Sequence, residues 1–104
     1  MSNKWNIPDW LESEVRARDL KCIYCRRSFT TPDVSVKTAP SWEHIVNDAS
    51  IINRENIALC CRACNASKGQ KRVSDWLSSA YCTKHEISQD TVADVAKKAI
   101  EKGL

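Results

Sequence analysis

Four cysteines form two closely spaced pairs, Cys22 with Cys25 and Cys61 with Cys64. Two intervening residues allow both sulfurs of a pair to turn onto one metal ion. Two such pairs supply the four soft ligands of a closed tetrahedral zinc site. Free buried thiols are the alternative interpretation. We therefore expect these cysteines to bind one structural zinc ion that takes no part in chemistry.

The segment between the two pairs, residues 26–60, is longer than the roughly 15–20 residues of a simple zinc ribbon. It contains Glu43 beside His44, and Asn56 stands five residues before the second pair. Asn65 follows that pair directly. An imidazole can take up a proton near pH 7, and carboxylate and amide oxygens suit hard divalent cations. The insert therefore carries candidate groups for catalysis.

Two cysteines remain outside this pattern. Cys60 adjoins Cys61 and could compete for the ion, but Cys61 gives the two-residue spacing. We expect Cys60 to be a small buried side chain. Cys82 and His85 form a C-x-x-H pair, which could be half of a second metal site, although the sequence offers no other half.

The stretch WEHIVNDASIINRENIALCCRACNASKG, residues 42–69, resembles the HNH endonuclease family. In that family an acid–His pair is followed by an Asn five residues before a C-x-x-C. A His or Asn comes after the second cysteine, and then a Lys-Gly. The resemblance covers about residues 20–72. It implies an α+β fold, a small ββα-metal (HNH/His-Me finger) core stapled by a four-cysteine zinc site, with flanking N- and C-terminal helices.

The resemblance also implies roles for the polar residues in divalent-metal-dependent hydrolysis of DNA phosphodiester bonds. His44 would be the general base. Glu43 and Asn65 would hold a catalytic Mg²⁺ or Mn²⁺ that stabilises the departing 3′ oxygen and leaves a 5′ phosphate. Asn56 would tie the loop between the strands to backbone near His44 and so orient the imidazole.

Two features of this set bear on its geometry. Adjacent residues on a flat strand point to opposite faces, so Glu43 and His44 can converge only where the strand ends, twists or bulges. The resemblance implies that the two side chains do converge here, as they do in the family. The Pro and Gly-Gly of the family's intervening loop are absent here. We therefore expect a differently shaped loop between His44 and Asn56.

Positive charge gathers around the cysteine pairs. The formal net charge is +3, and residues 62–73 contain no acid but four cations, which are Arg62, Lys68, Lys71 and Arg72. A solvated basic face is the plain interpretation, and a phosphate-facing surface is the sharper one. We expect Lys68, Lys71 and Arg72 to contact DNA phosphates, which gives affinity with little sequence information.

The leading hypothesis is thus a DNA endonuclease that nicks one strand with low sequence specificity, as a monomer or a homodimer. Trp5 or Trp76 could mark a dimer interface, although core packing is the favoured role of each. A non-catalytic zinc module that binds nucleic acid or a protein is the second hypothesis. A thiol redox protein that uses C-x-x-C is the third, and two pairs argue against it.

Length and composition limit the number of domains and the cellular location that these hypotheses can assume. A chain of 104 residues suits one domain, residues 1–104, with a core modest enough to benefit from a metal staple. The first ten residues, MSNKWNIPDW, contain no apolar segment typical of a signal peptide, and no apolar run has the length of a membrane span. We therefore expect a cytoplasmic protein without membrane contact.

The elements that must position these residues can be outlined from the pattern of apolar and turn-forming residues. We expect a first helix after Pro8 that ends near residue 20, with Trp10, Leu11, Val15 and Leu20 on its apolar face. Strands are expected from Trp42 to Val46 and from Ile57 to Cys60, and a helix from Cys61 to Lys68 that Gly69 ends. A helical extension, residues 74–103, would contain a short helix at 74–79, which Ser74 could cap, and a last helix after Ser88. Its face would be Val92, Val95, Ala96, Ala99 and Ile100, and Gly103 would end it.

Overall fold

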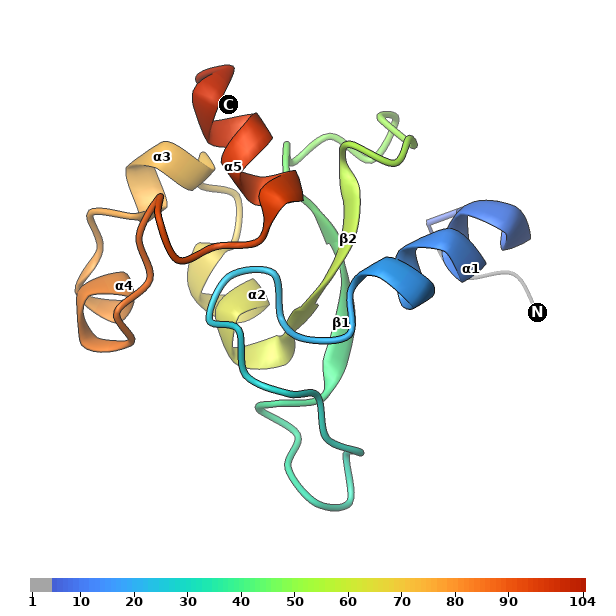
Figure 1. Cartoon of the computed structure of the whole chain (residues 1–104), viewed down its shortest axis with the longest axis horizontal. Coiled ribbons are helices and arrows are strands. Elements are labelled where there is room, and N and C mark those ends of the chain that lie inside the picture. Colours follow the sequence, from blue (N-terminus) through green and yellow to red (C-terminus); the bar gives the residue numbers. More distant parts are fainter. Residues whose placement is uncertain (1–4) are drawn as a thin grey trace.

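A two-stranded antiparallel hairpin lies at the centre of the fold in a computed structural model, which describes residues 5–104 (Figure 1). Strand β1 is Pro40–His44 and strand β2 is Ile57–Cys61, and the register pairs Pro40 with Cys61 and His44 with Ile57. Within residues 5–104, five helices surround the hairpin: α1 Asp9–Arg18, α2 Arg62–Lys68, α3 Val73–Trp76, α4 Ala80–Lys84 and α5 Asp94–Glu101. The described residues form a small, compact α+β domain. None of these helices is long and apolar enough to cross a membrane.

Strand β1 begins and ends two residues earlier than the sequence predicts. The ladder stops because the side-chain oxygen of Asn56 accepts the Val46 N–H at 2.7 Å, in place of a backbone partner on β2. Strand β2 and helix α2 follow their predicted ranges closely. Gly69 ends α2 with φ +53° and an N–H bond to the Asn65 carbonyl, so the prediction for this glycine is confirmed.

Helix α1 covers one face of the hairpin through Leu11 and Val15, as predicted. The prediction was wrong for Trp10 and Leu20, which are 60% and 73% exposed. The helix ends at Arg18, so Leu20 lies beyond its apolar face, and Trp10 is turned about 100° from Leu11.

A buried carboxylate attaches the end of α1 to β2. Asp19 accepts the Leu59 N–H at 3.0 Å and two hydrogen bonds from the Arg18 guanidinium. That guanidinium also donates to the Ile57 carbonyl. These bonds bring the first cysteine pair, which begins three residues after Asp19, alongside the hairpin.

The C-terminal extension differs from the prediction of one short helix at 74–79. Helix α3 begins at Val73, without a side-chain cap from Ser74, and a separate helix α4 follows it. Ser79 starts α4 by accepting the Cys82 N–H. In α5 and the turn before it, Val92, Ala96 and Ala99 are buried and Val95 and Ile100 are half-buried, so the predicted apolar face is confirmed.

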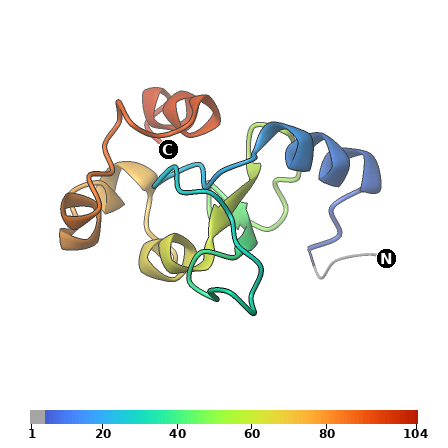
Figure 2. The same ribbon diagram turned by 60° about the horizontal axis from the view of Figure 1, so that its bottom comes forward.

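The two faces of β2 belong to two apolar clusters. Ile57 and Leu59 pack with α1, whereas Ala58 and Cys60 pack with the opposite cluster, which contains the first cysteine pair and residues from α2, α3 and α5. Trp76 is fully buried in that second cluster, and the expected core role of this residue is confirmed. Helices α1 and α4 accordingly lie at opposite ends of the molecule with the hairpin between them (Figures 1 and 2).

Candidate functional site

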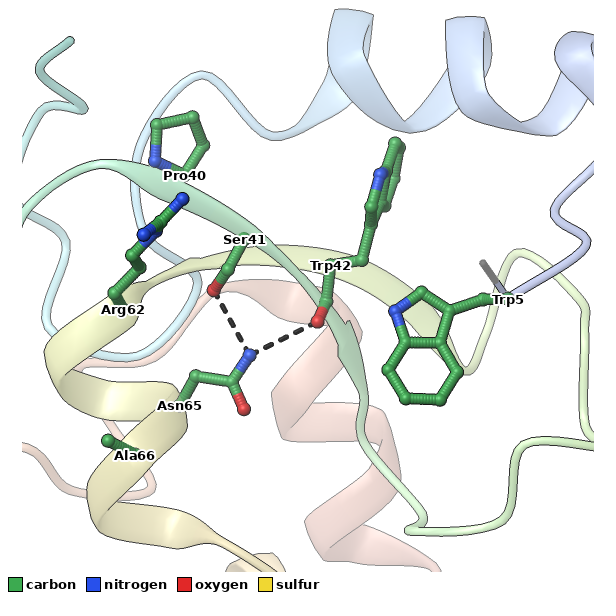
Figure 3. A pocket seen from close by; sticks show the side chains of 7 residues that line it. All are labelled: Trp5, Pro40, Ser41, Trp42, Arg62, Asn65 and Ala66. Carbon is green, nitrogen blue, oxygen red and sulfur yellow. Dashed lines mark hydrogen bonds between the residues drawn. The ribbon is translucent and has the colours of Figure 1, made fainter. Parts of the chain in front are cut away.

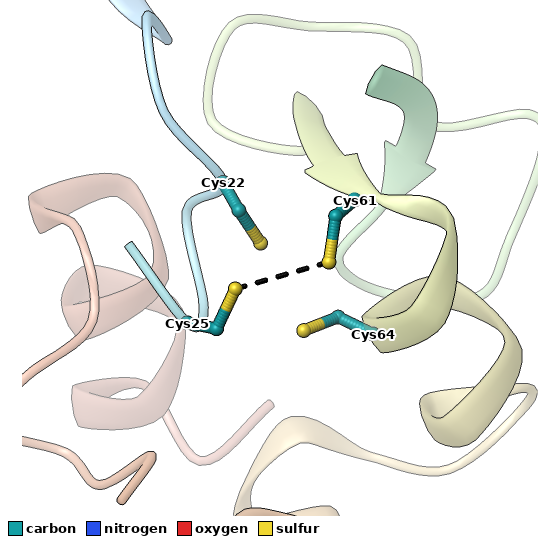
Figure 4. A group of neighbouring side chains, drawn as sticks. All are labelled: Cys22, Cys25, Cys61 and Cys64. Atoms are coloured by element: carbon teal, nitrogen blue, oxygen red, sulfur yellow. Dashed lines mark hydrogen bonds between the residues drawn. The ribbon is translucent and has the colours of Figure 1, made fainter. Parts of the chain in front are cut away.

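The sulfurs of Cys22, Cys25, Cys61 and Cys64 all lie within 4.8 Å of one another (Figure 4). Two come from the turn at residues 22–25 and two from the junction between β2 and α2. The Cys25 and Cys61 sulfurs are 3.8 Å apart. The cluster can hold a metal ion such as zinc, because four soft sulfurs point at one centre.

Local backbone geometry builds the first half of this cluster. The Cys22 N–H bonds to the Arg27 carbonyl and the Arg26 N–H bonds to the Cys22 carbonyl, which closes a tight turn with Arg26 at φ +64°. The Ile23 N–H bonds to the Leu59 carbonyl at 3.3 Å and so holds the turn against β2. The second half needs no loop, because Cys61 is the last residue of β2 and Cys64 lies one turn into α2.

Hydrogen bonds among the thiols and their neighbours favour thiolates at two positions. The pKa of Cys61 is lowered to about 6, chiefly by the hydrogen bond from Cys22. The pKa of Cys25 is lowered far more by Cys22, with help from the Arg27 guanidinium, whose Nε lies 3.3 Å from the sulfur. A metal ion binds thiolates, so it would take the place of the protons that these sulfurs otherwise share.

The remaining cysteines lie outside the cluster. Cys60 is fully buried beside Ser41, and burial raises the pKa of its thiol, as suits a core side chain. Cys82 is also buried in the core, and the His85 ring packs at a tilt against the Tyr81 ring, with 4.3 Å between ring centroids. Within residues 5–104, the one group of three or more His, Cys, Asp or Glu side chains placed to share an ion consists of Cys22, Cys25, Cys61 and Cys64.

His44 is a buried imidazole whose Nε2 has no hydrogen-bond partner among the described residues. The residue is 7% exposed, and the ring of Trp5 meets it edge-on with 4.9 Å between ring centroids. Burial lowers the pKa of His44 below 6.5, and the Lys68 charge adds to that effect while Asp48 opposes it. The imidazole is therefore neutral near pH 7 and can accept a proton.

Glu43 points to the other face of β1 from His44. Its Oε2 accepts a hydrogen bond of 2.6 Å from the Tyr24 hydroxyl and lies 3.3 Å from the Lys68 ammonium. Burial raises the pKa of the Glu43 carboxyl, although Lys68 and Tyr24 both act to lower it. The pairing with β2 stays regular through this point, with Glu43 opposite Ala58 and His44 opposite Ile57, so the two adjacent side chains diverge.

Asn56 braces the loop that follows His44. Its side-chain nitrogen donates to the carbonyls of Val46 and Ile51, at 3.2 and 3.1 Å, and its oxygen accepts the Val46 N–H. The loop between the strands is thereby tied to backbone two residues from the imidazole. The expected orienting role of Asn56 requires such a placement, and the role itself stays a prediction.

Asn65 faces a surface hollow of about 530 Å³ (Figure 3). Its side-chain nitrogen donates to the Ser41 hydroxyl and to the Trp42 carbonyl, and its oxygen points away from both bonds. The hollow is also lined by Trp5, Pro40, Arg62 and Ala66. The Asn65 oxygen can therefore act as a ligand or acceptor within the hollow. Glu43 and its partners Tyr24 and Lys68 are not among the residues that line this hollow.

The expected catalytic metal does not fit the pair Glu43 and Asn65. The Glu43 carboxylate is buried against a lysine ammonium, whereas the Asn65 amide lies at the hollow. A divalent ion would have to displace the Lys68 cation to reach Glu43. The residues present therefore do not form the two-ligand site that the sequence suggested.

The expectation that Lys68 contacts DNA phosphates is wrong. It is 1% exposed, and its ammonium donates to the Ile45 carbonyl at 3.0 Å as well as pairing with Glu43. A side chain so buried cannot contact a phosphate. Lys71 and Arg72 are exposed, as a phosphate-facing role requires.

Sequence reasoning missed three residues of this site, which are Tyr24, Lys68 in its buried role, and Trp5. Tyr24 and Lys68 contact Glu43 only because the chain folds back, and no local spacing in the sequence predicts such a contact. Trp5 lies outside every motif of the sequence. No protein-family model, no curated protein and no solved structure matches this chain.

Proposed function

We propose that the chain is a DNA endonuclease of the HNH type, stabilised by one structural zinc ion on Cys22, Cys25, Cys61 and Cys64. The ββα-metal core would consist of β1, β2 and α2. The observation that carries this proposal is the His44 imidazole, which is neutral near pH 7 and keeps an unpartnered Nε2. The resemblance of residues 42–69 supplies the reaction class.

In the proposed reaction His44 acts as general base. It removes a proton from a water molecule as that water attacks phosphorus, and the bond from phosphorus to the 3′ oxygen breaks, which leaves a 5′ phosphate. A neutral imidazole suits this step because its free ring nitrogen can accept the proton that the water gives up. Asn56 holds the adjacent backbone, so the imidazole keeps its direction during the reaction.

Substrate would reach the imidazole from the hollow beside Asn65. Trp5 packs on the His44 ring and also lines that hollow, so a displacement of the Trp5 side chain would open the ring to it. Arg62 in the wall of the hollow, with the exposed Lys71 and Arg72, supplies positive charge for the DNA backbone.

The resemblance implies that a Mg²⁺ or Mn²⁺ ion takes part, and Asn65 is the candidate ligand whose oxygen is available. Glu43 is left out of the proposed metal site because its carboxylate is paired with Lys68. No step above depends on the position of that ion.

A second function, a zinc module that binds nucleic acid without cleaving it, is favoured by two observations. The Nε2 atom of His44 is covered, and the Glu43 carboxylate is already paired. Such a module would use the same basic residues and need no catalytic groups.

The deciding experiment uses supercoiled plasmid, zinc-loaded protein and either Mg²⁺ or Mn²⁺. Wild type should nick the plasmid, and His44→Ala should lower the rate by about 10²–10⁴-fold, the range of general acid–base catalysis. His85→Ala, which changes the other histidine of the chain, is the matched control and should retain the wild-type rate. Salt-sensitive DNA binding without any cleavage would favour the second function. Equal cleavage by wild type and His44→Ala would refute the proposed role of His44.

A further inference from the structure

Three polar side chains from separate parts of the chain meet in the core beside His44. Tyr24 comes from the first cysteine turn, Glu43 from β1 and Lys68 from the end of α2. The Tyr24 hydroxyl and the Lys68 ammonium both contact Glu43 Oε2, at 2.6 and 3.3 Å. The side chains of Lys68 and Glu43 are 1% and 5% exposed, so water contributes little to solvating either charge.

The contacts of Lys68 fall on both sides of His44. Glu43 precedes the histidine and Ile45 follows it, and the Lys68 ammonium binds the carboxylate of the first and the carbonyl of the second. One residue further on, the Asn56 side chain holds both the N–H and the carbonyl of Val46. The backbone that carries the imidazole is therefore held from α2 and from the interstrand loop.

A buried ion pair is a costly way to fill a core. Apolar side chains of similar volume often stabilise a fold equally well or better, whereas a buried polar network can fix one arrangement of its members. Here the network fixes the segment that carries the proposed base. The Tyr24 hydroxyl extends it to the cysteine turn, so the network joins the metal cluster to β1.

We propose that Lys68 and Glu43 are positioning residues that clamp the backbone on both sides of His44 and set the direction of its imidazole. Glu43 then serves through Lys68 and Tyr24 rather than as a ligand of a divalent ion. The structural part of this proposal stands without any activity, and its kinetic part rests on the proposed nuclease function.

The structural part is tested by NMR on the zinc-loaded protein. The variants are Lys68→Met, the neutral double variant Glu43→Gln with Lys68→Met, and Lys98→Met, a matched change of an exposed lysine on α5. The double variant leaves no buried charge at positions 43 and 68, so it keeps the test valid if Lys68→Met alone fails to fold.

We expect the double variant to shift the His44 ring resonances and to speed amide exchange at Ile45 and Val46 by about tenfold or more, relative to Leu59 in β2. Lys98→Met should leave all three amides and the ring unchanged. Wild-type ring resonances and wild-type exchange at Ile45 in the double variant would overturn the proposal.

The kinetic part separates positioning from metal binding. The double variant should lower kcat with little change in KM, whereas Lys71→Met, at an exposed lysine placed for DNA, should raise KM with kcat retained. Glu43→Gln should bind Mn²⁺, followed by its paramagnetic resonance signal, as wild type does. A rise of about tenfold or more in the Mn²⁺ dissociation constant of Glu43→Gln would show a ligand role and overturn the proposal. If wild type cleaves no DNA, the nuclease function fails, while the NMR result still decides whether the clamp exists.

Discussion

The four-cysteine cluster and the Glu43–Lys68 pair are two buried polar sites that both depend on α2, but they balance their charges in different ways. The cluster gathers four sulfurs within 4.8 Å of one another, and the Arg27 guanidinium contacts the sulfur of Cys25 at 3.3 Å. At Glu43 the carboxylate already has a cation, because Lys68 reaches back from α2 at 3.3 Å. A buried charge must be compensated, and the comparison indicates an external ion at the first site and a side chain at the second.

The largest difference between the two regions should appear when one cluster sulfur is removed. Cys61→Ala should lose the bound metal and with it most of the folding free energy, because zinc binding to small domains contributes about 10–16 kcal/mol. Cys60→Ala, its direct neighbour in the core, should keep one metal per chain and unfold only slightly earlier. Metal content and thermal unfolding measured on both proteins test this pair. A wild-type metal content in Cys61→Ala would exclude this residue as a ligand.

The Glu43–Lys68 pair predicts a smaller, purely local loss. Glu43→Ala leaves the Lys68 ammonium buried without its partner, and we expect a loss of about 3–5 kcal/mol in the free energy of unfolding. Glu14→Ala is the matched control, because Glu14 pairs with Arg54 at the exposed surface, where ion pairs contribute little. Denaturant unfolding of the metal-loaded variants gives both values. Equal stability of Glu43→Ala and Glu14→Ala would contradict the buried pairing.

The Asn56 brace should have an intermediate effect. Asn56→Ala leaves the partly buried Val46 and Ile51 backbone groups without their side-chain partner, which should cost about 1–3 kcal/mol. Asn47→Ala, at an exposed asparagine of the same loop, should leave the stability unchanged. Chemical denaturation compares the two variants directly. A stability loss in Asn47→Ala as large as that in Asn56→Ala would contradict the claim that the Asn56 side chain stabilises this loop.

The smallest predicted effect is a pH dependence that comes from His44. The pKa of His44 is lowered from 6.5, so the folded protein binds this proton less readily than the unfolded chain does. Stability from this group is therefore complete above pH 6.5 and falls as the pH drops from 6.5 toward the lowered pKa, by at most about 1.4 kcal/mol per pH unit. The same shift places the acid limb of kcat/KM below pH 6.5.

An NMR titration of the His44 ring checks the direction of this shift. A midpoint above 6.5 would contradict the burial of the imidazole. In Lys68→Met the midpoint should rise, since the Lys68 charge acts to lower the pKa of His44.

The elements that local sequence determines were the ones that could be predicted. The two-residue spacing of the cysteines fixes tight turns, Gly69 supplies a positive φ at the end of α2, and Asn56 braces its own loop. The buried face of α5 could likewise be predicted, because its apolar residues recur at a helical period within one short segment. In each of these cases the interacting atoms are near in sequence or belong to a motif whose geometry is self-contained.

The partners of Glu43 could not be predicted in the same way. Tyr24 and Lys68 lie 19 residues before and 25 residues after it, and their charges and hydroxyls carry no pattern that favours burial. Strand alternation did warn that Glu43 and His44 diverge, and the resemblance to a nuclease motif led to the opposite expectation. The burial of Lys68 could not be predicted from composition either. Composition does not distinguish Lys68 from the exposed cations Lys71 and Arg72 of the same basic segment.

The most direct test of the contrast between the two regions is a crystal structure of the zinc-loaded protein soaked in Mn²⁺, with anomalous diffraction recorded at both metal edges. The account predicts a zinc peak at the centre of the four sulfurs, and a Glu43 carboxylate that remains paired with Lys68 and coordinates no manganese. A manganese peak bound by both Glu43 and Asn65, with the Lys68 ammonium displaced, would contradict it.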